Sequence, residues 1–354
     1  MRVEMIKKIV GLRYSKYILL GIFLACMPML QSMGIIRSQT LQTFGTVVFY
    51  GVVALGLNVL LGYSGLVSLG TAGFMGLGAY ISAYLIGDLG LPFIVSIVLS
   101  VAIPTGIGIL VGLVSLRVAG MYLGIATLAV AEIFRQMFSQ FDFFTGGFSG
   151  KHAEFPDFFG LHLNRNQTFL FMVIILIILM ILTDNFIHSS VGRALLTMRV
   201  SEAAAQAMGI NLLKYKLMAF GIATTYAALG GILYAHFVRF IFPDTWNLLL
   251  SLQILAVIVI GGLKTIMGPI IGSFIVFGVP AIILNRLPVI GDIDGLAFVF
   301  NGVLIILVIL FYPHGLVHIV QDIKRIKLRD IINLLKRIKL RKMKNLFRGK
   351  KEQA

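Results

Sequence analysis

The chain has 354 residues, of which 58% are hydrophobic and only 12% are charged, with a net charge of +16. Soluble domains carry roughly 25% charged residues, so this composition excludes an ordinary soluble domain. Apolar stretches of about 20 residues recur along the sequence, and each is long enough to cross a hydrocarbon core of roughly 30 Å as a helix. A membrane β-barrel is excluded because runs such as residues 169–182 are apolar at every position rather than at alternate ones.

Hydropathy and turn residues predict ten membrane-spanning helices, and therefore an all-α integral membrane protein. The first apolar stretch follows a basic N-terminus in the manner of a signal peptide. No small-residue cleavage site follows it, so we expect a retained span. The chain has a single cysteine, Cys26, so no disulfide can form within it. The ten predicted spans cover residues 17–32, 41–62, 65–86, 92–116, 119–140, 167–187, 216–238, 247–263, 267–285 and 295–312.

The positions of the basic residues set the orientation. If both termini lie in the cytoplasm, 24 of the 30 Lys and Arg residues fall on the inner side and six on or near the outer side. Such a split is what the positive-inside rule predicts. We therefore predict a multi-pass protein of the bacterial inner membrane with cytoplasmic N- and C-termini. The longest outer connection is then residues 141–166, and the longest inner one is residues 188–215.

Glycines recur at short intervals between residues 55 and 80, inside otherwise apolar sequence. Glycine lets helix backbones approach closely in lipid, and it permits a broken helix whose freed carbonyls face protein or a water-filled cavity. The segment therefore suits either close packing alone or a transport pathway. The polar side chains Asn58, Ser64 and Ser68 in this segment are candidates for lining or gating such a pathway.

Two opposite charges lie in the fifth predicted span, where Glu132 and Arg135 share one helix face. A lone charge at the bilayer centre costs about 3 kcal/mol, so we expect Glu132 to pair with Arg135 or to line a cavity. The pair is thus either a gating group or a structural ion pair. In the outer loop that follows, Thr145, Gly146 and Gly147 suit gating, docking of an external protein or a simple tight turn.

The inner connection, residues 188–215, is predicted to form two short helices on the cytoplasmic face. Its alanines favour a helix with little side-chain bulk, which lets another protein surface approach closely. Glu202 falls in a first helical turn, where the helix dipole favours a carboxylate, and Gly209 suits a helix end. Connections that only join two spans are usually shorter. We therefore expect the loop to dock a partner through Arg193, Arg199, Glu202, Ala203, Ala204 and Gly209.

The C-terminal half contains a second glycine cluster, residues 261–278, which includes Pro269. Interrupted apolar segments in the two halves indicate an inverted repeat of spans 2–5 and 7–10 around a pathway near the midplane. Gln253, in the eighth span, either joins helices or contacts substrate. His236 and Arg239, near the outer end of the seventh span, are expected at the membrane interface.

Several of these motifs resemble one family. Glu202-Ala203-Ala204 followed by Gly209 resembles the coupling loop of ABC importer permeases. Residues 55–80 and the flanking segments 192–194 and 208–211 resemble the branched-chain amino acid permeases in particular. Within that family, residues 120–128, 132–135 and 145–150 resemble the LivM-type subunit rather than its LivH-type partner. Ala119 and the pair Phe148-Ser149 depart from the family pattern.

The resemblance implies a transport system with several subunits. It implies a homologous LivH-type permease subunit, two cytoplasmic ATP-binding subunits that hold ATP and Mg, and an external solute-binding protein that delivers leucine, isoleucine or valine. In such permeases the coupling loop conveys closure of the ATPases to the membrane domain. A permease of this architecture for urea or another small solute stays open as an alternative, as does a secondary transporter or channel that works alone.

The sequence indicates no enzyme, cofactor or metal site on this chain. Residues 261–265 resemble a phosphate loop only superficially, because a Walker sequence needs glycine directly before the lysine. The motif Gly62-Tyr63-Ser64-Gly65 matches that of rhomboid serine proteases. A nucleophilic serine needs a histidine within hydrogen-bond reach, however, and His236 is expected near the opposite membrane face.

The chain ends in a basic segment, with thirteen Lys and Arg residues after His318. Isoleucines and leucines recur among them at mostly helical spacing, which indicates an amphipathic helix on anionic membrane lipids rather than a nucleic-acid site. A disordered, solvated tail is the alternative. We thus divide the chain into residues 1–40 with the first span, a permease domain at 41–316, and a cytoplasmic tail at 317–354.

Overall fold

The computed structural model describes residues 2–115, 120–158 and 161–284, together with residues 299, 302, 303, 306, 310 and 315–317. Within them the chain forms a bundle of long helices with a few two-residue strands. The helices are α1 (Arg2–Ser32), α2 (Ser38–Leu57), the π-helix η1 (Asn58–Ser64), α3 (Thr71–Gly87), α4 (Phe93–Ser115), α5 (Met121–Gln140), α6 (Asp142–Thr145), the 3-10 helix η2 (Gly147–Ser149), α7 (Arg165–His188), α8 (Ser190–Val200), α9 (Glu202–Ala207), α10 (Leu212–Val238), the 3-10 helix η3 (Pro243–Trp246), α11 (Leu248–Gly261), α12 (Gly268–Ser273), the π-helix η4 (Phe274–Gly278) and α13 (Val279–Leu284).

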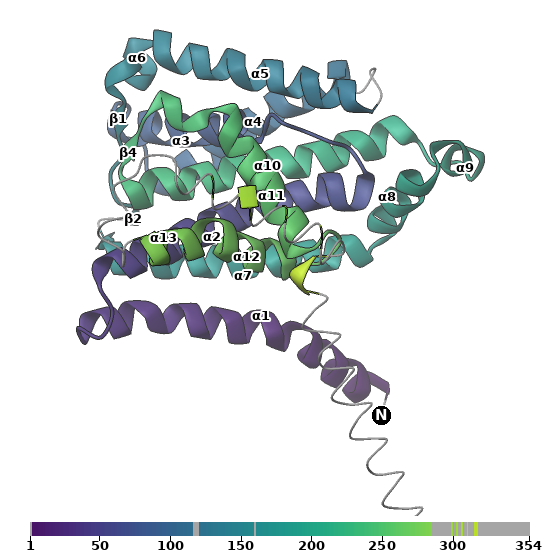
Figure 1. The fold of residues 1–354 in the computed structure, drawn as a ribbon, viewed down its shortest axis with the longest axis horizontal. Helices are drawn as coiled ribbons and strands as arrows, with labels where there is room; N and C mark the ends of the chain where they lie inside the picture. The colour runs from purple at the N-terminus through teal and green to yellow at the C-terminus, as the bar shows by residue number, and fades with distance from the viewer. Residues whose placement is uncertain are drawn as a thin grey trace, which may run out of the picture.

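The all-α prediction is confirmed, and the strands only close turns. Strand β1 (Lys151–His152) pairs antiparallel with β4 (Phe240–Ile241), with Lys151 opposite Ile241. Strand β2 (Asp157–Phe158) pairs antiparallel with β3 (Leu161–His162). All four lie at one end of the bundle in Figure 1, which we call the strand end. Helices α8 and α9 lie at the opposite end, which we call the coupling end.

Nine of the ten predicted spans coincide with helices, and the tenth, residues 295–312, falls mostly outside the described residues. Five helices are long and apolar enough to cross a membrane on their own, namely those at residues 14–32, 38–64, 93–114, 165–188 and 212–238. The apolar helices at residues 71–87, 248–261 and 268–282 are shorter. A helix of 14 residues such as α11 is about 21 Å long, so it reaches only part of the way across the hydrocarbon core.

The third span differs from its predicted limits of residues 65–86, because α3 begins only at Thr71. Gly65 has a left-handed backbone with φ of 78°, which ends η1 and turns the chain away from the helix axis. The chain up to Gly70 is then non-helical, and it leads back into the bundle before α3 starts. The second span is thus one continuous helix from Ser38 to Ser64, and the non-helical residues 65–70 lie between it and α3 rather than inside a span.

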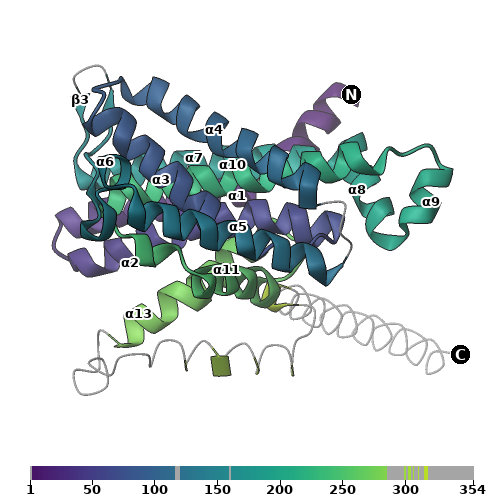
Figure 2. The ribbon, with the colours of Figure 1, turned by 90° about the horizontal axis from the view of Figure 1, so that it is seen from above.

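Helix α10 is the centre of the bundle, since it packs against α2, α3 and α4 (Figures 1 and 2). Glycines make the close crossings possible: a Cβ on Gly78 would lie 2.7 Å from the Cα of Ala228, and one on Gly56 would lie 3.3 Å from the Cα of Ala223. Larger side chains would force these helices apart. The core between them holds fully buried aromatic rings, among them those of Phe49, Phe74, Tyr80 and Trp246.

The outer faces of α1 and α4 carry large exposed apolar side chains. On α1, Leu19 is 71% exposed, and on α4 the exposed fractions of Leu110 and Val114 are 64% and 72%. A soluble protein rarely exposes apolar patches of this extent, whereas a hydrocarbon environment favours them. These faces are therefore the lipid-contacting surface of the bundle.

Candidate functional site

The coupling end is built from two short helices joined by one extended residue. Ser189 caps α8 by accepting from the backbone N–H of Gly192 at 3.4 Å, and Ser201 caps α9 by accepting from that of Ala204 at 3.2 Å. Gly209 follows α9 with φ of 78°, the left-handed conformation that ends a helix. The two predicted helices are confirmed, and they project beyond the bundle in Figure 2.

The exposed side of this pair is mostly small or apolar. Ala203 and Ala204 are exposed, while Ala205 is fully buried and packs α9 against the hydrophobic core. Val200 and Met208 are 87% and 73% exposed, respectively, and sequence reasoning did not include them among the site residues. Exposed apolar side chains beside alanines indicate a surface that another protein covers.

Two predicted coupling residues are tied to neighbouring elements. The Glu202 carboxylate lies 2.7 Å from Nζ of Lys216, in the first turns of α10. Arg193 donates to the carbonyl of His188 at 3.0 Å, so its contact stays local. The sequence placed Glu202 at a helix start correctly. It could not reveal Lys216 as the partner, because that depends on how α9 folds back on α10.

The contact of Arg199 reaches much further along the chain. Its guanidinium donates to the carbonyl of Gly62, in η1, and its aliphatic stem lies against Gly65, where a Cβ would be 3.1 Å from Cγ of Arg199. The coupling end is thereby joined to η1, the last part of the second span.

The three polar candidates near η1 are hydrogen-bonded within the protein. Asn58 is fully buried; its side chain accepts from the N–H of Lys264 at 3.1 Å and donates to the carbonyl of Thr265 at 2.8 Å. Ser64 donates to the carbonyl of Leu60, and Ser68 accepts from the N–H of Gly70 at 3.3 Å. Asn58 therefore joins helices, while both serines stabilise their own turns.

A cavity of only about 10 Å³ lies where α3 begins, lined by residues that include Ser68, Thr71 and Phe74 with Phe220 and Thr224 of α10. This is about the space that one water molecule needs, so this cavity is too small for an amino acid. Gln253 is half-buried on α11, two residues beyond Ser251, whose hydroxyl accepts from the N–H of Ala72 at the start of α3.

Glu132 and Arg135 form the predicted pair. Nε of Arg135 lies 3.0 Å from both carboxylate oxygens of Glu132, and its Nη1 lies 3.3 Å from the carboxylate of Asp244 in η3. The Glu132 side chain is 49% exposed in the single chain, on the outer face of α5, so the pair does not line a cavity inside the bundle. Asp244 was missed because it lies 109 residues away in sequence.

Thr145, Gly146 and Gly147 form a tight turn at the strand end. The Thr145 hydroxyl is fully buried, donates towards the carbonyls of Phe138 at 2.6 Å and Phe141 at 2.8 Å, and accepts from the N–H of Gly147. Gly146 and Gly147 both have positive φ values, 73° and 54°. The sequence left open gating, docking of an external protein or a tight turn. The geometry is that of a tight turn, in which Thr145 is fully buried.

His236, which the sequence placed near the outer interface, lies two residues before the end of α10 and is 2% exposed. Its Nδ1 lies 2.6 Å from the carbonyl of Glu154, in the loop after β1, and its Nε2 lies 2.7 Å from the hydroxyl of Ser82. The ring thus joins α10, α3 and the loop at the strand end, while Ser64 lies in η1, which contacts α8 of the coupling end. Ser64 and His236 therefore lie at opposite ends of the described bundle, and Ser64 does not have the histidine partner that the protease motif would need.

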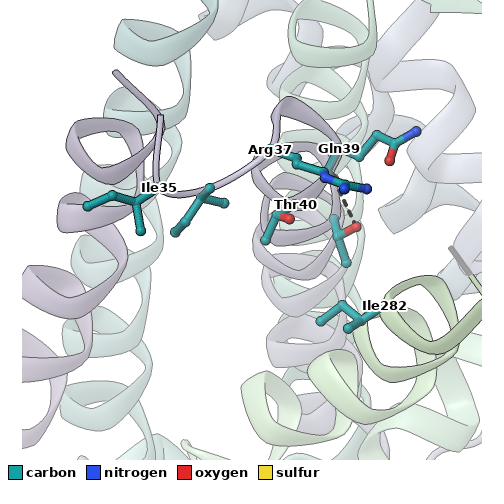
Figure 3. Close-up of a pocket in the computed structure, with 7 residues that line it drawn as sticks. Ile35, Arg37, Gln39, Thr40 and Ile282 are labelled. Atoms are coloured by element: carbon teal, nitrogen blue, oxygen red, sulfur yellow. Dashed lines mark hydrogen bonds between the residues drawn. The ribbon is translucent and has the colours of Figure 1, made fainter. Parts of the chain in front are cut away.

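A separate open cavity of about 540 Å³ lies at the rim, between the α1–α2 turn and α13 (Figure 3). Arg37, Gln39 and Thr40 line it from the start of α2, with Ile35 at the left of the view and Ile282 of α13 at the lower right. It contains no predicted site residue and lies apart from the packed α2–α3–α10 core, so we assign it no role in transport.

A bundle of long apolar helices with lipid-contacting faces is typical of a multi-pass membrane protein. The chain matches the family described as "Branched-chain amino acid transport system / permease component" over residues 39–311, and it belongs to that family. It is therefore a permease component of an ABC transporter.

Two curated relatives agree with this family. The chain is 27% identical to the high-affinity branched-chain amino acid transport system permease protein LivM of Escherichia coli strain K12, over 85% of this chain and 74% of the relative. It is also 27% identical to the LivM protein of Salmonella typhimurium strain LT2, over 78% of this chain and 70% of the relative. No match was found among solved structures. The resemblance to the LivM type seen in the sequence is confirmed.

Proposed function

We propose that this chain is one membrane subunit of an ATP-driven importer of leucine, isoleucine and valine. The observation that carries the proposal is the α8–α9 pair, which projects from the bundle and exposes a small, apolar surface on Ala203, Ala204 and Met208. The substrates rest on the two relatives named as branched-chain amino acid permeases.

In this proposal the coupling end faces the cytoplasm, as do both termini. The N-terminal end of α1 lies at the coupling end in Figure 1, and five of its residues up to Lys16 are Lys or Arg. Under the positive-inside rule such a cluster stays in the cytoplasm. The basic segment at 317–354 would then follow the permease domain, residues 41–316, and hold the inner leaflet through its anionic lipids.

The other components would be separate chains. Two cytoplasmic ATP-binding subunits would hold ATP and Mg and dock on α8 and α9, so that this chain hydrolyses nothing itself. A homologous LivH-type subunit would complete the membrane pathway, and an external solute-binding protein would deliver the amino acid at the strand end.

Transport would proceed by alternating access. Closure of the ATPases would push α9, which is joined to α10 by the Glu202–Lys216 ion pair. Because α10 is packed against α2, α3 and α4, a displacement of its end reaches most of the bundle. The closed space at the start of α3 would then widen towards one side of the membrane at a time.

Reconstitution of the purified complex in liposomes tests the proposal. We expect uptake of radiolabelled leucine that needs external binding protein and enclosed MgATP. Ala204→Arg places a large charge on the docking surface and should reduce co-purification of the ATPases at least tenfold. The matched variant Gln39→Arg, which adds the same group to an exposed residue at the other end, should bind them normally. Equal ATPase binding by both variants, or uptake without ATPases, would contradict the proposal.

A further inference from the structure

The hydrogen bonds around η1 join the coupling end to both halves of the membrane domain. Arg199 of α8 donates to the carbonyl of Gly62, at the end of the second span. On its other side, η1 is bonded to the turn between α11 and α12, residues 262–267. One short segment thus lies between the helix that an ATPase would move and a turn some 200 residues further along the chain.

Three hydrogen bonds connect η1 to this turn. The Asn58 amide bonds the N–H of Lys264 at 3.1 Å and the carbonyl of Thr265 at 2.8 Å, and the Tyr63 hydroxyl donates to the carbonyl of Lys264 at 2.7 Å. All three hydrogen bonds go to backbone atoms of the turn, so they hold its position independently of the identity of its side chains. A Cβ on Gly62 would lie 3.2 Å from the Lys264 nitrogen, which shows how closely η1 and the turn approach.

Both contact partners have unusual backbone conformations. Residues 58–64 form a π-helix, a form that occurs mostly as short interruptions of α-helices and often at functional sites. Lys264 has φ of 62°, in the left-handed region that is unfavourable for a non-glycine residue. Such conformations persist only while their neighbours hold them, so a pull on η1 can release both.

We infer that Arg199 is a positioning residue that transmits movement of α8 to η1, and that η1 with the 262–267 turn is the element that changes conformation during transport. The inference rests on the proposed function, because it needs ATPase subunits that move α8. When α8 shifts, the guanidinium carries the Gly62 carbonyl with it, η1 changes its winding, and the bonds from Asn58 and Tyr63 displace the turn. Coupling between distant sites requires one element with two arrangements that both sites bias, and we assign that role to η1 with this turn.

The test uses the complete transporter in liposomes and measures leucine transported for each ATP hydrolysed. Arg199→Gln should lower this ratio about tenfold, and because the ratio is taken for each ATP hydrolysed, a change in the amount of docked ATPase does not enter it. Arg199→Lys, which keeps a donor of the same charge, should recover part of the ratio. The control Lys214→Gln removes an exposed charge at the same end and should leave the ratio unchanged.

A second variant removes one hydrogen bond at the other end of the network and leaves the volume of the side chain almost unchanged. Tyr63→Phe deletes only the hydroxyl that bonds Lys264, and it should lower the ratio about threefold. If the two residues act in one chain of contacts, the double variant Arg199→Gln/Tyr63→Phe should be no worse than Arg199→Gln alone. If the double variant instead lowered the ratio by the product of the two single effects, the residues would act independently, and the inference would be overturned. Tyr63→Phe alone tests the network should Arg199→Gln fail to assemble.

A third measurement does not depend on the solute. In a chain with Cys26→Ser, Lys264→Cys places the only thiol on the exposed turn and keeps the backbone contacts. Trapping the ATPases with MgATP and vanadate should change the rate of maleimide labelling at least threefold, and Arg199→Gln should abolish that change. The same change in both chains would overturn the inference while the proposed function stands. If the wild-type chain bound no ATPase at all, the proposed function itself would fail.

Discussion

The two ends of the bundle are held in different ways. At the strand end, the Thr145 hydroxyl and the His236 ring are buried and bond backbone carbonyls, and β1 pairs with β4. Lys151 adds an ion pair with Asp88 and a bond to the carbonyl of Phe144 at 2.9 Å. At the coupling end, the outer side of α8 and α9 is exposed, while Leu195, Met198 and Ala205 pack into the core. Arg199 and Glu202 add polar contacts to η1 and α10.

This difference has a mechanical meaning. Breaking a buried hydrogen bond to a backbone group costs the full desolvation free energy of that group, whereas an exposed ion pair contributes about 0–1 kcal/mol to stability. The buried hydrogen bonds at the strand end should therefore stay intact unless a partner binds there strongly. The partly exposed Glu202–Lys216 ion pair at the coupling end can break at little cost in free energy. Substitutions at the strand end should change stability, and those at the coupling end should change coupling.

The largest effect is expected for Gly146→Val. A Cβ there would overlap the carbonyl of Gly150, and the left-handed φ adds its own strain. Backbone strain and overpacking together should cost about 3 kcal/mol or more, measured by SDS or thermal unfolding of the chain purified in detergent. Gly90→Val is the matched control, because Gly90 also has positive φ but open space around it, so only about 1–2 kcal/mol is expected. Equal losses would show that the turn is not tightly closed.

Thr145→Val should come next. The change keeps the volume but removes the hydroxyl that serves the Phe138 and Phe141 carbonyls and the Gly147 N–H. Leaving such buried groups unpaired costs about 1–3 kcal/mol. At the coupling end, Thr197→Val removes a hydroxyl that bonds only within its own helix, and it should cost less than about 0.5 kcal/mol. A reversal of this order in unfolding experiments would remove the distinction between the two ends.

Reversal of one charge should separate stability from coupling. Lys216→Glu places a second carboxylate beside Glu202 and should lower stability by about 1 kcal/mol or less, since the pair is partly exposed. Leucine uptake should fall much more, because α9 loses its tie to α10. The swap Glu202→Lys/Lys216→Glu should recover stability. Uptake that falls only in proportion to the amount of folded protein would argue against a mechanical role for the pair.

The smallest effect on stability is expected for Glu132→Gln. The carboxylate is half exposed, and Asp244 remains beside Arg135, so the change should cost less than about 1 kcal/mol. Thermal unfolding of the isolated chain measures this. A loss of several kcal/mol would mean that Glu132 is a buried structural group of the single chain, contrary to its exposure.

Patterns that repeat along one segment were readable from the sequence. Hydropathy located nine helices, and the alanine run with Gly209 located α9 and its end, because these features depend on neighbours in the chain. The start of α3 was misplaced, since the non-helical course before Thr71 depends on contacts with Thr127 of α5, whose hydroxyl accepts from the N–H of Leu69 at 3.0 Å.

Contacts between distant segments were not readable. Nothing local in the sequence pairs Arg199 with Gly62, Glu202 with Lys216, or Arg135 with Asp244, because each pair depends on how separate helices pack. The burial of His236 was missed for the same reason: its partners, Ser82 and Glu154, come from other elements. Asn58 was recognised as either a helix-joining or a substrate-contacting group, and only its bonds to the 262–267 turn favour the first.

The most direct test of the central claim is the accessibility of Met208, which is 73% exposed at the tip of the coupling end. In a chain with Cys26→Ser and Met208→Cys, a membrane-impermeant maleimide should not label intact cells. It should label inside-out vesicles stripped of ATPase, and added ATPase subunits should protect the thiol. Labelling of intact cells, or labelling of vesicles that the ATPases leave unchanged, would contradict the assignment of α8 and α9 as the site where a separate ATPase moves this chain.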